Sequence, residues 1–148
     1  MEIERKWLVD KNKISSFTNF GYRIEQHYIN DIEDDWLIRF RNEMGSYTMT
    51  LKGKGMMSRP EIEVDIDEKT YLNAIQYSKT SLKKTRFYTE IEPETDRYYE
   101  IDVFDDHDFI ICEVEFDTLE EAYKFIPPSW CLKEVTEDPE YTNINLAK

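Results

Sequence analysis

Charged and apolar residues alternate with a period of two at the start of the chain. Glu2, Glu4 and Lys6 occupy one set of alternating positions, whereas Ile3 and Trp7 occupy the other. This period is typical of a β-strand, whose successive side chains point to opposite faces. The first nine residues therefore predict a strand with one ionic face and one apolar face.

Seven further segments repeat this alternation. They predict strands over residues 22–29, 36–42, 47–54, 59–66, 82–91, 97–104 and 109–116. On most of these strands the charged face carries residues of one sign. The single-sign sets are Arg39 and Arg41, Lys52 and Lys54, Glu61, Glu63 and Asp65, Lys84 and Arg86, Glu100 and Asp102, and Glu113 and Glu115. Because like charges on one face repel, we expect acidic and basic faces to neutralise one another inside a single curved antiparallel sheet.

Short segments between the strands predict a few helices over the apolar outer faces. They span residues 10–20, 68–78 and 119–125, with Asp67 capping the second and Thr118 capping the third. Residues from 130 onward show no clear strand pattern. Because eight strands can close a barrel, the expected fold is α+β and mainly β. We expect one domain over residues 1–148, a closed eight-stranded antiparallel barrel with helices packed outside.

The overall charge excludes one class of partner but does not exclude anionic ligands. The formal net charge is -13 and the pI is about 4.6, which argues against nucleic-acid binding because that requires a basic stripe. The basic residues are nevertheless concentrated in two-residue steps on a few strands. An acidic protein can therefore still present a locally positive wall to phosphate.

The apolar residues and cysteines point to an ordinary intracellular domain. No apolar run approaches the length of a membrane span, and the first residues lack a basic and then apolar leader, so we expect a cytoplasmic protein without a membrane partner. Cys112 and Cys131 give no disulfide framework, and neither has metal-ligand spacing to His27 or His107. We interpret both cysteines as packing residues.

An ionic interior of this kind predicts a ligand that carries both signs of charge. Unpaired buried ions cost several kcal/mol each, so the interior must be wet and paired or must hold charged ligands. Paired carboxylates suit Mg²⁺ or Mn²⁺, and a triphosphate needs several cationic donors. The proposed phosphate cradle consists of Arg39, Arg41, Lys52, Lys54, Lys84 and Arg86.

The segment from Glu2 to Lys6 resembles the Glu-x-Glu-x-Lys signature of the CYTH domain, or triphosphate tunnel metalloenzyme, superfamily. The resemblance continues in the family's order over nearly the whole chain. The further matching segments are Ile38-Arg39-Phe40-Arg41, Thr50-Leu51-Lys52-Gly53-Lys54, Arg59-x-Glu61-x-Glu63, Lys84-Thr85-Arg86, Glu100-Ile101-Asp102, Glu113-Val114-Glu115, Glu134-Val135-Thr136 and Tyr141-x-Asn143. The family's last motif often has a basic residue where this chain has Glu140, which leaves closure of the tunnel by the tail open.

The resemblance implies a divalent-metal-dependent triphosphatase acting on a small triphosphate, with inorganic tripolyphosphate as the favoured substrate. It implies metal ligation by Glu2, Glu4 and Glu115, with Glu61, Glu63, Asp102 and Glu113 nearby. It implies substrate binding by Lys6, Arg39, Arg41, Lys52, Lys54, Lys84 and Arg86. It implies catalytic roles for Lys6, Lys84, Arg86 and Tyr28. Glu100, Glu113 and Lys54 could instead be structural counter-charges.

Two other functions remain open at this point. A class IV adenylate cyclase would use the same triphosphate cradle, but no set of residues for reading a base is visible. A non-catalytic sensor of polyphosphate or triphosphate would bind without turnover. The pattern is compatible with a monomer or a homodimer.

Overall fold

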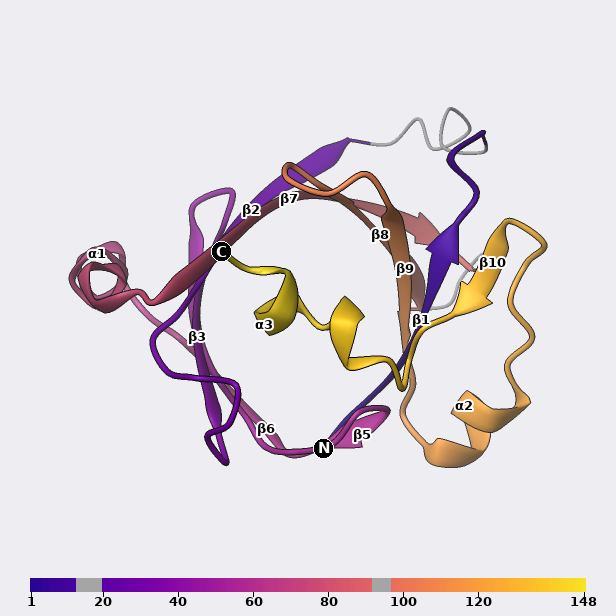
Figure 1. The fold of residues 1–148 in the computed structure, drawn as a ribbon, viewed down its shortest axis with the longest axis horizontal. Coiled ribbons are helices and arrows are strands. Elements are labelled where there is room, and N and C mark those ends of the chain that lie inside the picture. Colours follow the sequence, from indigo (N-terminus) through magenta and orange to yellow (C-terminus); the bar gives the residue numbers. More distant parts are fainter. Residues whose placement is uncertain (13–19, 92–96) are drawn as a thin grey trace.

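One antiparallel sheet forms most of the computed structural model, which describes residues 1–12, 20–91 and 97–148. Its strands are β1 (Glu2–Val9), β2 (Gly21–Tyr28), β3 (Leu37–Glu43), β4 (Ser46–Lys52), β5 (Ser58–Arg59), β6 (Glu61–Asp65), β7 (Thr80–Glu90), β8 (Tyr98–Phe104), β9 (Ile110–Glu115) and β10 (Cys131–Glu134). The strand order is β10-β1-β9-β8-β7-β2-β3-β4-β6. Viewed down the shortest axis of the molecule, the strands form a ring (Figure 1). The predicted mainly β, antiparallel fold is confirmed.

The ring is not closed by hydrogen bonds between the ends of the main sheet. Within the described ranges β6 pairs only with β4, whereas β5 pairs with β1 at Glu2 and Ile3. The sequence predicted one strand over residues 59–66, but Pro60 divides it into β5 and β6. Proline lacks the N–H that would continue the ladder. The closed eight-stranded barrel is therefore not confirmed, and β5 provides a two-residue bridge in its place.

The helices agree with their capping signals where the structure describes them. Asp67 accepts a hydrogen bond from the Thr70 N–H at 2.7 Å and begins α1 (Glu68–Ala74), which continues as the 3₁₀ turn η2 (Ile75–Tyr77). Thr118 caps α2 (Leu119–Lys124) in the same way. The helix predicted over residues 10–20 falls mostly on residues 13–19, outside the described part of the chain.

The main apolar core lies on the outer face of the ring, as predicted. Ile3, Trp7, Cys112 and Val114 are buried there together with Ala122 of α2. These positions alternate with the charged residues of β1 and β9, so each strand separates an apolar outer layer from an ionic inner layer. Among the helices that the structure describes, none is long and apolar enough to cross a membrane.

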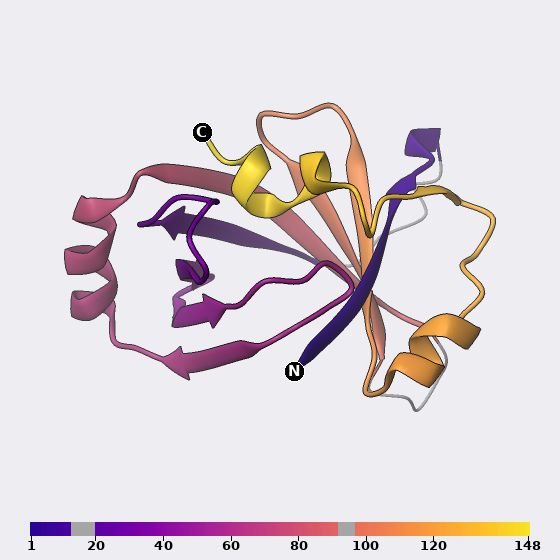
Figure 2. The ribbon, with the colours of Figure 1, turned by 60° about the horizontal axis from the view of Figure 1, so that its bottom comes forward.

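The C-terminal segment contains a strand that the sequence did not predict. β10 pairs with β1, with Trp7 opposite Glu134. Only its first residue is even partly buried, so the strand lacks the alternation that marks the others. Beyond it, the 3₁₀ turn η3 (Pro139–Tyr141) and the short helix α3 (Asn143–Leu146) cross the ring in Figure 1 and lie over one side of it in Figure 2.

The C-terminal segment seals one end of the ring. Lys148 and Ser81 of β7 exchange two backbone hydrogen bonds of 2.9 and 3.0 Å. Leu146 of α3 is buried against Leu82, Phe104 and Ile111, which lie on the same inner face as Lys84, Asp102 and Glu113 but one step further along their strands. The inner face is thus apolar where α3 covers it and ionic beyond, so the charged space opens away from α3.

Candidate functional site

The ionic faces of the strands surround a polar cavity of about 180 Å³ inside the ring, which we call the lumen. Its lining side chains come from strands on both sides of the ring, and every one is polar or charged. They belong to Glu2, Glu4, Arg39, Arg41, Lys52, Glu61, Glu63, Arg86, Tyr88, Glu100, Glu113, Glu115 and Asn143. A wider hollow of about 770 Å³ shares Glu2, Glu61 and Glu115 with the lumen and opens toward solvent. The predicted ionic interior is therefore present.

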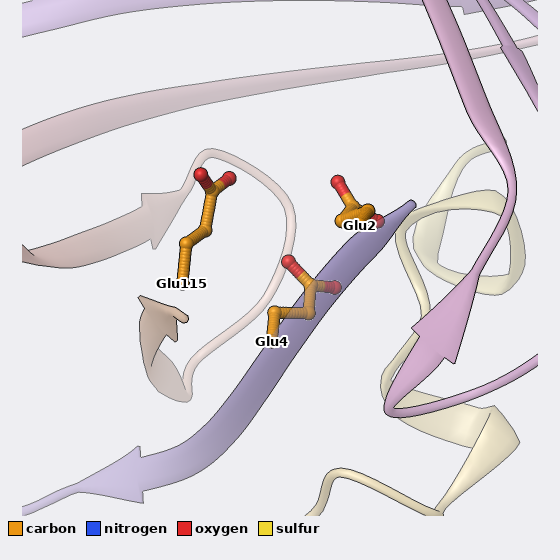
Figure 3. A group of neighbouring side chains, drawn as sticks. All are labelled: Glu2, Glu4 and Glu115. Carbon is orange, nitrogen blue, oxygen red and sulfur yellow. The ribbon is translucent and has the colours of Figure 1, made fainter. Parts of the chain in front are cut away.

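Three carboxylates from two neighbouring strands meet at the junction of the lumen and the wider hollow. Glu2 and Glu4 occupy alternate positions of β1, and Glu115 of β9 lies directly opposite Glu4 in the antiparallel register. One oxygen from each carboxylate lies within 4.8 Å of the others. Figure 3 shows the three side chains turned toward a common space. We call this group the carboxylate trio.

The members of the trio are neutralised to different extents. Glu2 accepts from Lys52 at 3.1 Å and from Arg59 at 3.1 Å. Burial would raise the pKa of Glu2, but these two cations and a hydrogen bond with Glu61 hold it well below the ordinary value. Glu4 lies 3.7 Å from Lys6 and 3.8 Å from Arg59, and its burial and the nearby Glu113 raise its pKa.

Glu115 has no cationic partner in the described part of the chain. Partial burial raises its pKa to about 8, with further contributions from Glu100, Glu4, Glu2 and Glu113. Three convergent carboxylates, one of them unpaired, form an oxygen donor set that suits a hard divalent cation. The trio therefore fits the metal that the sequence analysis implied.

The other predicted acidic ligands lie around the trio rather than in it. Glu61 is beside Glu2 and 3.4 Å from Lys52, and burial together with Glu2 raises its pKa to about 7. Glu63 accepts from Thr50 and Arg39 on the far wall of the lumen. Both side chains face the lumen, but their carboxylates already interact with basic or hydroxyl groups.

Asp102 and Glu113 are held by the basic residues of the lumen. Asp102 is fully buried and accepts from Lys84 at 2.8 Å and from Arg86 at 2.7 and 2.8 Å. Burial would raise the pKa of Asp102, but Arg86 and Lys84 lower it, so Asp102 remains ionised. Glu113 lies 3.8 Å from Lys6 and 3.6 Å from Arg86. Both acids thus orient cations.

Arg41 carries the least compensated positive charge of the lumen. Its guanidinium donates to the neutral amide oxygen of Gln26 at 3.0 and 3.2 Å, and it forms no ion pair with a carboxylate of the described residues. Burial, followed by repulsion from Arg39 and Arg86, lowers its pKa to about 10. Because the charged form of Arg41 is destabilised in this way, an anionic ligand bound beside it would stabilise that charge.

Two predicted members of the phosphate cradle do not line the lumen: Lys84 is fully buried behind its wall, and Lys54 lies on the surface of the molecule. Lys54 is 69% exposed and pairs with Asp35 at 2.8 Å. β4 ends at Lys52, so the alternation that places Lys52 inside does not continue through Gly53 to Lys54. The expectation that Lys54 shares the inner face is therefore wrong.

The structure shows which face of β2 points inward. Ile24, Gln26 and Tyr28 are buried, and the Tyr28 hydroxyl accepts a hydrogen bond of 2.9 Å from the Gln26 amide. Gln26 in turn accepts from Arg41, so Tyr28 lies on the lumen side. Its predicted catalytic role remains a prediction.

Three residues of this region were absent from the predicted site. Arg59 contacts Glu2 and Glu4, Gln26 holds Arg41, and Asn143 of α3 accepts from Lys84 at 3.3 Å. Arg59 could have been found from its alternation with Glu61 and Glu63 across Pro60. Gln26 is uncharged, and the approach of Asn143 depends on the path of the C-terminal segment.

Comparisons with known proteins identify the relatives of this chain. The model of the CYTH domain family matches residues 1–127. An inorganic triphosphatase of Nitrosomonas europaea is 35% identical, covering 99% of this chain and 96% of the relative. An inorganic triphosphatase of Acetivibrio thermocellus is 31% identical over 99% of this chain and 93% of the relative. A crystal structure of an inorganic triphosphatase superposes with a TM-score of 0.66 and 33% identity, covering 99% of this chain and 94% of that chain.

Proposed function

This chain belongs to the CYTH domain family, and we propose that it hydrolyses inorganic tripolyphosphate with the help of Mg²⁺ or Mn²⁺. Its similarity over nearly full length to two inorganic triphosphatases supports hydrolysis of a triphosphate. The observation that carries the proposal is the opposite excess of charge across one cavity. Glu115 lacks a cation on the β1–β9 side, whereas Arg41 lacks a carboxylate on the β3 side, within the described residues in both cases.

The unpaired negative charge suits the divalent cation, and the unpaired positive charge suits the triphosphate. Glu2, Glu4 and Glu115 would hold the divalent cation, and Glu61 lies close enough to Glu2 to share it. When bound, the cation supplies charge neutralisation at the phosphoryl oxygens and lowers the pKa of a coordinated water. Arg39, Arg41, Lys52 and Arg86 would bind phosphoryl oxygens, since the guanidinium groups offer forked, charge-assisted donors.

The buried ion pairs of the lumen would keep these donors in place. Asp102 fixes Arg86 through two hydrogen bonds and also holds Lys84, whose amine is fully buried. Lys6 lies between Glu4 and Glu113, next to the trio. Phosphoryl transfer needs chiefly positioning and charge compensation, so this arrangement requires no covalent nucleophile. We assign Lys6, Lys84, Arg86 and Tyr28 to alignment of the reacting end.

The fold would enclose the substrate as a tunnel that is open mainly on one side. β5 bridges the gap between β1 and β6, and Leu146 with its apolar neighbours blocks the end covered by α3. The substrate would then enter through the wider hollow beside Glu2, Glu61 and Glu115. This route brings the phosphates past the metal site.

Product identification tests this function. The purified protein is incubated with Mg²⁺ and one substrate at a time, namely tripolyphosphate, ATP or thiamine triphosphate. The products of each reaction are separated by ion-exchange chromatography. We expect phosphate release, fastest from tripolyphosphate. Cyclic nucleotide formed from ATP would identify a cyclase instead. Tight binding of tripolyphosphate without any turnover would identify a sensor.

A further inference from the structure

Arg59 already occupies the carboxylates that the metal would need. Its Nε donates to Glu2 Oε1 at 3.1 Å, and its terminal nitrogen lies 3.8 Å from Glu4 Oε1. Both acids belong to the carboxylate trio. The Arg59 side chain is only 14% exposed, and its ion pairs in the described residues are with these two acids. A guanidinium therefore neutralises two of the three oxygen donors.

The backbone holds Arg59 in this position. β5 pairs with β1 so that Arg59 lies directly opposite Glu2. The preceding turn requires glycine at position 55, where φ is +141° and an added Cβ would lie 2.1 Å from the Ser58 carbonyl oxygen. The turn thus directs a long, flexible cationic side chain onto the trio without filling the lumen.

We propose that Arg59 is a placeholder cation that neutralises Glu2 and Glu4 when the divalent metal is absent and competes with its binding. This inference rests on the proposed function, because it takes the trio to be the metal site. A cation with two positive charges needs oxygens of these same two carboxylates, so its binding displaces the guanidinium. The freed Arg59 then lies beside the lumen, where phosphoryl oxygens offer it a new partner.

Competition gives a prediction opposite in sign to that of a structural role. If Arg59 only held Glu2 and Glu4 in place, its loss would weaken metal binding. If it competes with the metal, its loss strengthens metal binding in the absence of phosphate and destabilises only the metal-free protein. Three variants separate these cases: Arg59→Gln removes the charge, Arg59→Lys keeps it, and Arg23→Gln removes the same charge from the exposed Arg23–Asp105 pair on the outside of the ring.

The test measures the Kd of Mn²⁺ by calorimetric titration of each phosphate-free protein, together with thermal unfolding with and without saturating Mn²⁺. We expect Arg59→Gln to bind Mn²⁺ roughly tenfold more tightly than the wild type, and Arg59→Lys and Arg23→Gln to stay within about twofold. The melting temperature of Arg59→Gln should fall below wild type without metal. With saturating Mn²⁺ that gap should close, because the metal replaces the missing charge.

Unchanged or weaker Mn²⁺ binding by Arg59→Gln would overturn the placeholder role, as would a melting-temperature gap that persists at saturating Mn²⁺. Either result would leave the metal site itself intact, provided that the wild type binds Mn²⁺. A wild type that binds no Mn²⁺ would instead contradict the metal site of the proposed function and would remove the basis of this inference.

Discussion

At the scale of single residues, the state of each charge in the lumen follows from what lies opposite it. Asp102 is surrounded by two basic side chains and is already satisfied, so it serves to fix them. Arg41 faces a neutral amide, and Glu115 faces other carboxylates. A charge that lacks a counter-charge is stabilised when a ligand of opposite sign binds beside it, so these two residues should gain most from bound ligands.

Arg41 should therefore contribute strongly to substrate binding. We expect Arg41→Ala to raise the KM for tripolyphosphate by roughly tenfold to a hundredfold, since hydrogen bonds to charged groups contribute about 1.5–3 kcal/mol. Steady-state phosphate release measures this change. Lys54→Ala is the matched control, because Lys54 lies outside the lumen, and it should leave KM within about twofold of wild type. The reverse ranking of these variants would refute the assignment of the basic wall.

Glu115 should link metal binding to stability. We expect the metal-free Glu115→Gln variant to be as stable as the wild type or more so, because the substitution removes a carboxyl group whose charged form is disfavoured by the carboxylates around it. Saturating Mg²⁺ should raise the melting temperature of the wild type by several degrees and that of the variant by much less. Calorimetry of the two proteins provides the comparison. Equal stabilisation of both by Mg²⁺ would place the metal elsewhere.

At the scale of elements, β1 organises the molecule because both of its faces are in use. Its inner face supplies Glu2, Glu4 and Lys6, while Arg5 on the outer face donates to Glu134 of β10 and to the carbonyls of Ala122 and Phe125. Arg5 thus connects β1 to β10 and to the end of α2, so the strand that carries the trio is held from outside the ring.

The Arg5–Glu134 pair should give a stability difference that depends on pH. The hydrogen bond from Arg5 lowers the pKa of Glu134 in the folded protein. Its contribution is therefore fully present above the ordinary value of 4.5 and is lost as the pH falls through the lower folded value. We expect Glu134→Gln to lower the free energy of unfolding by about 0.5–1 kcal/mol at pH 7, and the gap to close at acidic pH.

Urea unfolding at several pH values measures this gap. Glu120→Gln provides the control, because Glu120 and Lys124 form an exposed pair on α2, and it should change stability by only a few tenths of a kcal/mol at about neutral pH. A Glu134→Gln deficit that persisted unchanged at pH 3 or so would mean that lost packing, and not charge, causes it.

At the scale of the whole molecule, the inner face changes from ionic to apolar along its length. The apolar end holds Leu82, Phe104 and Ile111, and the C-terminal segment brings Leu146 onto them. Asn143 on the same helix reaches Lys84. The C-terminal segment therefore covers the apolar end of the inner face and also contacts the basic side chain of Lys84.

Loss of the Leu146 side chain should destabilise the whole molecule. We expect Leu146→Ala to lower the free energy of unfolding by about 2–4 kcal/mol, since it leaves a cavity in a buried cluster. Leu132→Ala removes the same atoms from an exposed position of β10 and should cost far less. Urea midpoints at constant slope measure both. Similar small effects for the two variants would show that the C-terminal segment is not a stabilising part of the fold.

The sequence predicts this architecture wherever side chains alternate strictly. The ionic inner face and the apolar outer face follow from that period. The approach of Glu115 to Glu4 depends on the pairing of β1 with β9, and the family resemblance, not the period, implied it. The misplacement of Lys54 arose where the strand ends before the charge pattern does. β10 and the docking of α3 depend on long-range contacts of segments without periodicity, which local patterns do not encode.

The most direct test of the account is the rate of phosphate release from tripolyphosphate as a function of free Mg²⁺, compared between wild type and Glu115→Gln. Because tripolyphosphate itself binds Mg²⁺, the free cation is buffered and calculated for each point. We predict that wild-type turnover requires Mg²⁺ and stops on chelation, and that Glu115→Gln needs far more Mg²⁺ and turns over much more slowly at every concentration. Wild-type turnover that survived chelation, or a Glu115→Gln curve that coincided with the wild-type curve at limiting Mg²⁺, would contradict the carboxylate trio as the metal site of this enzyme.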